Sequence, residues 1–562
     1  MENEAKLLRE IEKKNFFSRI ATYFKLSGPG WLQSAFSLGG GSLAGSLYLG
    51  VLAGYSMLWL QPVAMFLGII MLSALGYVTL ASGQRPLQAI NKHVNPVLGW
   101  GWAAASLITS VVWALPQFSL AVSAVQQNLL PDLLGSEGLF GHTGNMIVIS
   151  MFVFLAAVAI TWNYDRGTRG IRLYEWMLKG MVALVVLSFI GVVFRLIFIS
   201  GVVNWSELGS GLIPNPSLMF KPAVGFLPLL ETLSGPSREY WTGLLVNQQQ
   251  NVMAAALSSA VGINMTFLFA YSMLRRKWGP EYKGLMRFDM ATGMFIPFVL
   301  ATGCVMVASS SQFHTVPQPG FTETEIHDRG GMLSNPTQYA QFRGFLENRI
   351  HFEHGEQEFT DEEMQMMIDQ LPAEDLVMAA TLITRDAFDL ALSLEPLLGT
   401  FFAHIVFGIG VLGMAVSSIT LMMLVSGLVL CEALGVKRGG LTFKLGSLAA
   451  GLGILGPFFW TQAYFWLAIP VSIITLMFLP IAYVTFFLMM NNKALLGEHM
   501  PKGTNRVIWN LLMVLALLFI GSASFYMLWM RGGVVGLMIL VIFVTAIIVA
   551  EIYKRLNKYT KI

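Results

Sequence analysis

The chain has 562 residues, of which 55% are hydrophobic and only 12% are charged, and its formal net charge is +3. Water-soluble domains carry about 25% charged residues, so this composition excludes an ordinary soluble protein, and we expect no nucleic-acid partner. Long uncharged apolar runs recur and predict an all-α protein that crosses the lipid bilayer many times. Cys304 and Cys431 lie inside such runs, which disfavours both a disulfide and a zinc site.

Residues 1–26 are rich in charge and have no long apolar core, which predicts a cytoplasmic segment rather than a cleaved signal peptide. Within it, residues 3–25 can form a basic amphipathic helix, either on the inner membrane surface or in solvent. About twelve apolar stretches long enough to span a membrane follow, over 30–54, 56–82, 98–127, 144–162, 176–200, 249–274, 286–309, 397–432, 441–459, 464–490, 506–530 and 533–553.

Lys and Arg gather in alternate short loops of this arrangement, which sets the orientation of the chain in the membrane. With the N-terminus in the cytoplasm, the outer short loops are nearly free of basic residues. We therefore expect transmembrane helices 1–7 within 27–309, helices 8–12 within 397–553 and a cytoplasmic tail over 554–562. Both termini are then cytoplasmic, and the plasma (inner) membrane is the expected location.

The first apolar stretch is interrupted at its middle by Gly39, Gly40, Gly41 and Ser42. Glycine inside a helix costs about 1 kcal/mol relative to alanine, so the run predicts that the helix stops there. Inside a membrane, open backbone is tolerated only where it is buried in protein or lines a cavity. The sixth stretch carries a second interruption over 262–265. Two breaks five spans apart indicate an inverted repeat with a substrate site at its interface, as in secondary transporters.

Two long segments are predicted to lie outside the cell, over 201–248 and over 310–396, and the second of these is hydrophilic and acidic. Thr360 and Glu363 have the spacing of a capping box, which predicts a helix over 361–371. A second, amphipathic helix is expected over 383–394.

His351 and His354, in the same segment, could bind a metal only with further ligands from elsewhere, and an acidic solvated cap is the alternative. Asp289 and Glu432 lie near the inner ends of spans seven and eight, where we expect local ion pairs. His404 in span eight makes either a satisfied polar contact or a proton relay.

Several segments resemble the Nramp family of divalent-metal transporters. They are GPGWLQSAFSLGGGSLAGSLYLGVLAGYSMLW (28–59), Phe288-Asp289, FGIGVLGMAVSSITLMMLVSGLVLCE (407–432), Leu479-Pro480-Ile481-Ala482, and the run from Asn492 to Glu498. The resemblance covers the membrane part and not the 310–396 segment. It implies the LeuT-like fold, with two five-helix inverted repeats, broken helices 1 and 6, alternating access, and a central site between spans one, six and eight.

The same resemblance implies that the family's metal-binding and proton-pathway motifs are replaced. At its first break the family has Asp-Pro-Gly-Asn, whereas this chain has the sequence of residues 39–42, Gly-Gly-Gly-Ser. In its sixth span the family has Met-Pro-His-Asn, whereas this chain has Gly-Ile-Asn-Met over 262–265. The family's eighth-span Gln is Val416 here, and its proton-pathway His becomes Asn264.

We therefore expect an uncharged substrate site with no cofactor, no resident metal and no catalytic residues, formed by Gly39, Gly41, Ser42, Gly262, Asn264, Met265 and Ser417. Burying a bare divalent ion without a counter-charge is costly. The function expected is transport of a small ion, most plausibly a partly hydrated divalent metal cation, without the usual proton coupling.

Two alternatives stay open. The N-terminal ends of half-helices suit anions, so the chain could instead carry a small organic or anionic solute such as a carboxylate or amino acid. It could also be a non-transporting membrane sensor that binds through its outer segment. No phosphate loop, zinc motif or nucleophile elbow is present in the sequence, so an enzyme is not expected. The sequence carries no signal for an oligomeric state.

Overall fold

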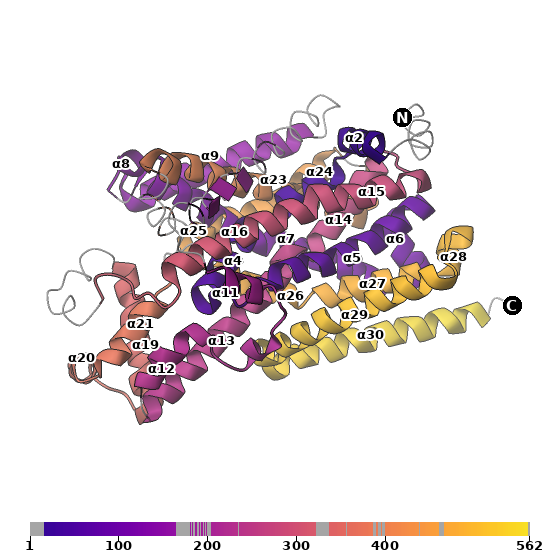
Figure 1. The fold of residues 1–562 in the computed structure, drawn as a ribbon. Helices are drawn as coiled ribbons and strands as arrows, with labels where there is room; N and C mark the ends of the chain where they lie inside the picture. The colour runs from indigo at the N-terminus through magenta and orange to yellow at the C-terminus, as the bar shows by residue number, and fades with distance from the viewer. Residues whose placement is uncertain are drawn as a thin grey trace.

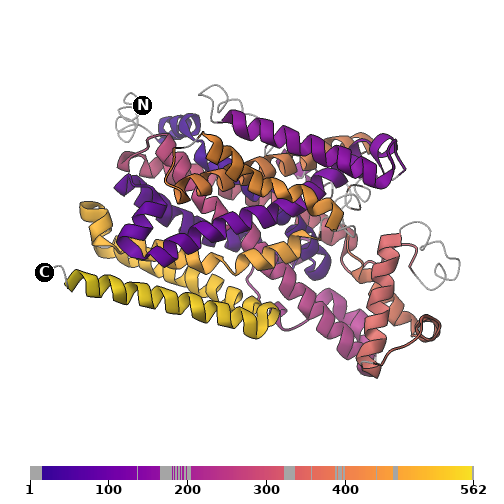
Figure 2. The same cartoon turned by 180° about the vertical axis from the view of Figure 1, so that it is seen from behind.

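The computed structural model describes residues 16–559, except 136, 234, 322–335, 356, 438, 460–465, 165–179 and scattered positions within 181–203 and 386–398. The elements of these residues are helices, which confirms the predicted all-α class. Most of the long helices run roughly along one direction (Figure 1). Helix α2 (Phe16–Leu26) and the C-terminal end of α30 (Gly533–Tyr559) lie at one end of the molecule, and α12 (Leu227–Thr232) lies at the opposite end, in both views (Figures 1 and 2).

The apolar helices follow most of the predicted spans. They are α3 (Pro29–Ser37), α4 (Gly40–Ala53), α5 (Leu60–Ser82), α7 (Pro96–Ser123), α9 (Gly141–Tyr164), α13 (Gly235–Ala260), α14 (Ile263–Arg275), α15 (Lys283–Met290), α16 (Ile296–Phe313), α23 (Phe407–Ala433), α24 (Leu441–Gly451), α26 (Ala468–Leu476), α27 (Leu479–Met490), α29 (Gly503–Met527) and α30 (Gly533–Tyr559).

Among the described residues, nine helical stretches are long and apolar enough to cross a membrane, or ten if the bent pair α3–α4 counts as one span. One of the nine, Gly503–Leu556, contains two helices, because the chain turns back near Gly533 and α29 and α30 lie side by side in both views. The predicted fifth span, 176–200, lies largely outside the described residues.

The first span is broken, as predicted, and the axes of α3 and α4 differ by 51°. The break is shorter than expected: only Leu38 and Gly39 lie between the two helices, so Gly40, Gly41 and Ser42 form the first turn of α4. Glycine is needed at residue 41 for packing, because a Cβ atom there would lie 1.9 Å from Cη2 of Trp113. The glycine run therefore has two roles: it interrupts the first span, and it allows α7 to pack closely against α4.

The sixth span is also interrupted, at Val261 and Gly262, between α13 and α14. The predicted break extended to Met265, but Asn264 and Met265 belong to the first turn of α14. Helix α13 begins at Gly235, well before the predicted start of the span at residue 249. The segment 201–248 is therefore partly helical rather than a loop, and it also contains α11 (Trp205–Gly211) and α12.

Residues 310–396, hereafter the outer insert, contain α19 (Pro336–His354), α20 (Asp361–Asp369) and α21 (Ala373–Leu382). The predicted capping box is confirmed, because the Thr360 hydroxyl accepts from the Glu363 N–H (3.3 Å) and Glu363 Oε2 accepts from the Thr360 N–H (2.9 Å). Of the helix predicted over 383–394, residues 383–385 are not helical and most of the rest lies outside the described residues.

The two histidines singled out in the sequence lie in the last turn of α19. Their ring centroids are 5.8 and 6.0 Å from the ring of Phe359 for His351 and His354 respectively. In the part of the chain that the structure describes, no group of three or more His, Cys, Asp or Glu side chains is arranged to hold a metal.

The outer insert, so named for its predicted location, is attached to one helix of each broken span. On the α13 side, the buried Asp375 carboxylate accepts from Ser237 Oγ and Trp241 Nε1, both at 2.5 Å, and lies 3.5 Å from Nε of Arg349. On the α4 side, the Tyr48 hydroxyl donates to the carbonyl oxygen of Arg385. The insert is therefore held to α4 and α13 together.

The capping box gives a pH-dependent prediction. Hydrogen bonds from the Thr360 backbone N–H and hydroxyl lower the pKa of Glu363. Since the folded-state pKa is the lower one, the capping contribution is present above the unfolded pKa and is lost as pH falls through the folded value. Amide exchange in the first turn of α20, corrected for intrinsic rates, should accelerate on acidification below about pH 4. The Glu363→Gln variant should lose this dependence, whereas Glu362→Gln should retain it.

Candidate functional site

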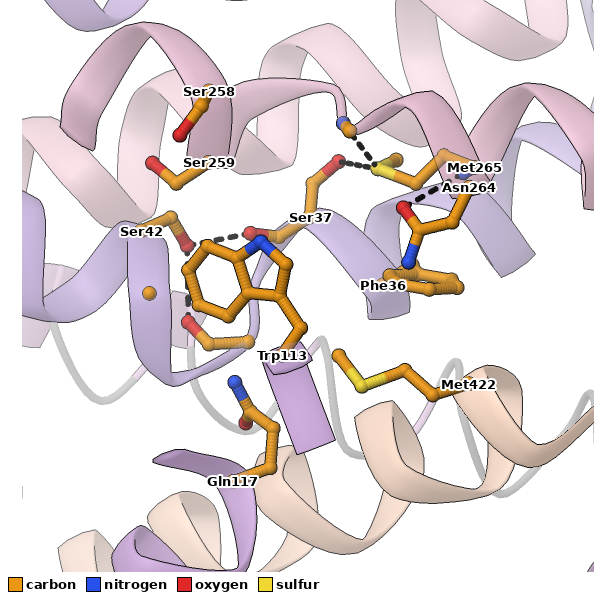
Figure 3. A pocket seen from close by; sticks show the side chains of 13 residues that line it. Phe36, Ser37, Ser42, Trp113, Gln117, Ser258, Ser259, Asn264, Met265 and Met422 are labelled. Atoms are coloured by element: carbon orange, nitrogen blue, oxygen red, sulfur yellow. Dashed lines mark hydrogen bonds between the residues drawn. The ribbon is translucent and has the colours of Figure 1, made fainter. Parts of the chain in front are cut away.

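A small cavity lies where the two helix breaks meet (Figure 3). Its 13 lining residues come from α3, α4, α7, α13, α14, α23 and the two breaks. They are Phe36, Ser37, Gly39, Gly41, Ser42, Trp113, Gln117, Ser258, Ser259, Gly262, Asn264, Met265 and Met422. About 20 Å³ of this cavity is open to a water-sized sphere, which is room for about one water molecule.

Six of the seven predicted site residues meet in this cavity: Gly39, Gly41, Ser42, Gly262, Asn264 and Met265. Ser417 does not line it, which corrects the sequence-based expectation. Its hydroxyl donates to the Met414 carbonyl oxygen (2.8 Å) within α23 and is satisfied there. Helix α23 instead contributes Met422 to the cavity.

Hydrogen bonds tie the first break to the second. Ser42 Oγ donates to the Ser37 carbonyl oxygen (2.5 Å), across the break between α3 and α4. Ser37 Oγ donates to the carbonyl oxygen of Ala260 (2.8 Å), at the end of α13. These hydroxyls therefore hold the C-terminal ends of α3 and α13 next to each other.

Side chains also hold the first turns of α4 and α14, which begin at the two breaks. The Gly40 N–H donates to Gln117 Oε1 (3.1 Å), so α7 fixes the start of α4. At the start of α14, the Gly262 N–H donates to Met265 Sδ (3.2 Å) and the Met265 N–H donates to Asn264 Oδ1 (3.0 Å). Asn264 Nδ2 in turn donates to Ser110 Oγ (3.3 Å) on α7.

This pattern has an electrostatic consequence. An N–H group has one proton to donate, and three of the N–H groups at the half-helix starts already donate to side chains. A carbonyl oxygen has two lone pairs, so the carbonyl of Ser37, which lines the cavity, keeps acceptor capacity after its hydrogen bond from Ser42. None of the 13 lining residues is ionisable. The cavity therefore offers neutral oxygen acceptors to a cation.

Several lining residues were not predicted, notably Trp113, Gln117 and Met422. They lie on α7 and α23, which continue unbroken past the cavity. Trp113 is fixed by a hydrogen bond from Nε1 to Thr475 Oγ1 (3.1 Å). Polar or bulky side chains on an unbroken apolar helix are equally typical of packing, so the sequence held no signal that distinguished these three.

The N-terminal end of α3 is held by an acidic side chain. The buried carboxylate of Asp289 accepts from the N–H groups of Gly28 (3.2 Å) and Gly30 (2.7 Å), at the positive end of the α3 dipole. These contacts are to the backbone, and the ion pair expected for Asp289 stays a prediction. The ion pair expected for Glu432 is confirmed, with Arg85 Nη1 3.3 Å from Glu432 Oε1.

Replacing Asp289 with alanine should release this end of α3. The change leaves two buried N–H groups without their carboxylate acceptor, at a cost of about 2 kcal/mol. Hydrogen exchange at residues 28–32 should accelerate correspondingly. Asp289→Asn keeps an oxygen acceptor and should have a smaller effect, and equal protection in the wild type and Asp289→Ala would contradict the assignment.

Comparison with known proteins gives one family. The family model described as "Natural resistance-associated macrophage protein-like" (Nramp) matches residues 30–334 and 374–530. The match thus extends into both ends of the outer insert, further than the quoted motifs indicated, and omits the segment that contains α19 and α20. A comparison with curated protein sequences gave no match.

Solved structures show the same fold. The manganese transporter of Eremococcus coleocola, in complex with an aromatic bis-isothiourea substituted compound, is 12% identical with a TM-score of 0.59, over 97% of this chain and 96% of that chain. A single-substitution variant of that transporter is 13% identical with a TM-score of 0.52 and the same coverage. At this identity the likeness concerns the fold, and it confirms the predicted LeuT-like arrangement.

Proposed function

The chain belongs to the Nramp family, and from this premise we propose that it is an integral membrane transporter that moves a small metal cation by alternating access. The observation that carries the proposal is the uncharged cavity between the two helix breaks, which is the place where transporters with broken helices bind their substrates. The Eremococcus coleocola protein with the same fold is a manganese transporter.

We propose that the cation binds to the residues of the breaks, namely Gly39, Gly41, Ser42, Gly262, Asn264 and Met265. Hydroxyl and carbonyl oxygens of these segments supply neutral ligands, and binding proceeds without the carboxylates and the histidine that the family motifs carry. Because none of the lining residues is ionisable, uptake should not be tightly coupled to protons through this site.

The organic-solute alternative is less well supported. The cavity has space for about one water molecule, which is too little for an amino acid in this conformation. Three of the N–H groups at the starts of α4 and α14 already donate to Gln117, Met265 and Asn264, which leaves fewer of them to bind a carboxylate. The third alternative, a sensor without transport activity, is distinguished from a cation transporter and from an organic-solute carrier because it would show no uptake of any solute.

We also propose that both termini are cytoplasmic, that the outer insert lies outside, and that the protein resides in the plasma (inner) membrane. The end of the molecule that holds the termini also holds α6 (Pro86–Ala89), α15 and α28 (Lys493–Leu496) (Figure 1). These segments and their flanks carry Arg85, Lys92, Lys283, Arg287 and Lys493, as the positive-inside rule requires of the cytoplasmic side.

Uptake into proteoliposomes tests the function and the partly hydrated divalent ion predicted from the sequence. Manganese and magnesium should be measured with and without a pH gradient, in the wild type and in Ser42→Ala and Asn264→Ala. Ser417→Ala is the matched control, because its hydroxyl lies outside the cavity and bonds within its own helix. Saturable metal uptake that Ser42→Ala and Asn264→Ala weaken, and the control does not, supports the proposal. Absence of uptake for these ions and for silver would overturn it.

A further inference from the structure

Two methionine side chains line the cavity from different helices. Met265 comes from α14 and Met422 from α23, both are 2% exposed, and both line the cavity on different sides (Figure 3). A thioether is a neutral, polarisable ligand, and thioether and thiolate ligands select soft ions such as Cu(I) over magnesium, calcium or manganese. The sulfur of Met422 was not expected from the sequence. Met265 Sδ accepts from the Gly262 N–H (3.2 Å) and from Ser37 Oγ (3.9 Å), so an ion that binds Met265 replaces these contacts.

The absence of charge among the lining residues limits the charge of the ion. The Born cost of taking an ion out of water rises with the square of its charge, so a divalent ion costs about four times as much as a monovalent ion of equal radius. The 13 residues around this cavity provide no anionic side chain to offset that cost. A monovalent cation therefore fits the electrostatics of the site best.

The size of the cavity limits the water that the ion can keep. With about 20 Å³ open to a water-sized sphere, the site holds an ion with little or none of its hydration shell. Magnesium gives up its water reluctantly and usually keeps several water molecules when bound. Soft monovalent ions lose their water more readily because they hold it less strongly, and protein ligands replace it.

Trp113 adds a further uncharged group that attracts cations. Its indole ring lines the cavity, packs against Gly41 and is fixed through the hydrogen bond to Thr475. An ion in so small a cavity lies against its walls, and the face of an indole attracts a cation within about 6 Å of the ring centre. This attraction needs no negative charge, so it favours the same class of ion.

We infer that the cavity binds a soft monovalent metal cation of the Cu(I) type, with the thioethers of Met265 and Met422 as ligands and the oxygens of the two breaks completing its surroundings. This inference rests on the proposed function, of which it names the substrate class. Silver(I) is the probe, because it has the same charge and preference for sulfur and needs no reductant.

The experiment measures silver binding to the full-length protein in detergent and silver uptake into proteoliposomes, with manganese and magnesium uptake in parallel. Met422→Leu should weaken silver binding about ten-fold, which corresponds to about 1.4 kcal/mol. Met423→Leu is the matched control, because Met423 is the next residue on α23, is fully buried and does not line the cavity. Met422→Cys keeps a sulfur at this position and should retain silver binding.

The outcomes separate the two proposals. Silver binding and uptake that fall in Met422→Leu, and persist in Met423→Leu and Met422→Cys, support the inference. Manganese or magnesium uptake without silver uptake overturns the inference and leaves the proposed function in place. No uptake of any of these cations overturns both. If Met422→Leu elutes as an aggregate, Met265→Leu tests the second ligand, and Met265→Cys is its control because Met265 Sδ also accepts from the Gly262 N–H.

Discussion

Replacing Gly41 with alanine is expected to abolish cation uptake while the protein still folds. The new methyl group would lie 1.9 Å from Cη2 and 2.2 Å from Cζ3 of Trp113, so the indole has to move. Trp113 lines the cavity and is fixed to Thr475, so its displacement deforms the site. We expect at least about a 100-fold loss of uptake, the size that ångström-scale misplacement produces at functional sites, and a stability loss of about 1–3 kcal/mol from overpacking.

Gly45→Ala is the control for this change. Gly45 lies one turn further along α4, and the nearest atom to a Cβ there is Nε2 of Gln61 at 3.7 Å, an ordinary contact. This variant should transport as the wild type does. Normal uptake by Gly41→Ala, with the expression and elution profile of Gly45→Ala, would mean that the position of Trp113 does not define the transport site.

Replacing Asp375 with alanine should produce the largest loss of stability. The Asp375 carboxylate is fully buried, accepts from Ser237 and Trp241 and lies beside the guanidinium of Arg349, which is itself 4% exposed. Removing one partner of a buried ion pair typically costs about 3–5 kcal/mol. Arg349 keeps an ion pair with Glu353 (2.9 Å), so we expect a loss near the lower end of that range, to which the unsatisfied donors of Ser237 and Trp241 contribute. We expect amide exchange in α19 and α21 to accelerate by a corresponding factor and limited proteolysis to cut the outer insert first.

Asp369→Ala provides the comparison, since Asp369 lies at the exposed end of α20. Its removal should change the stability of the insert by less than about 0.5 kcal/mol, as surface substitutions usually do. Equal protection of α19 in Asp375→Ala and Asp369→Ala would show that the buried cluster does not hold the insert on α13.

The sequence predicted the features that depend on local backbone chemistry. Both breaks followed from glycine inside apolar stretches, and the capping box from the spacing of Thr360 and Glu363. The exact position of the first break could not be predicted, because glycine serves both an interrupted helix and close packing. Only the position of Trp113 in the fold shows that Gly41 is needed for close packing.

Features that depend on contacts between residues far apart in the chain could not be predicted from the sequence. Asp375 lies in an acidic segment, where an aspartate is normally solvated, and its burial depends on Trp241 and Arg349. Met422 is one apolar residue among many on α23, and only the packing of that helix against the breaks brings its side chain to the cavity. Ser417, which the resemblance suggested, lies on the same helix and points its hydroxyl to its own backbone.

The attachment of the outer insert to both α4 and α13 connects the insert directly to two of the helices that line the cavity. In the alternating access proposed above, α4 and α13 change position, and the insert moves with them. An antibody fragment that prefers one position of the insert would then arrest the cycle in one state. Since coupling between two binding events is reciprocal, the affinity of such a fragment would change when the cavity fills, and its fluorescence could report occupancy from outside the cell.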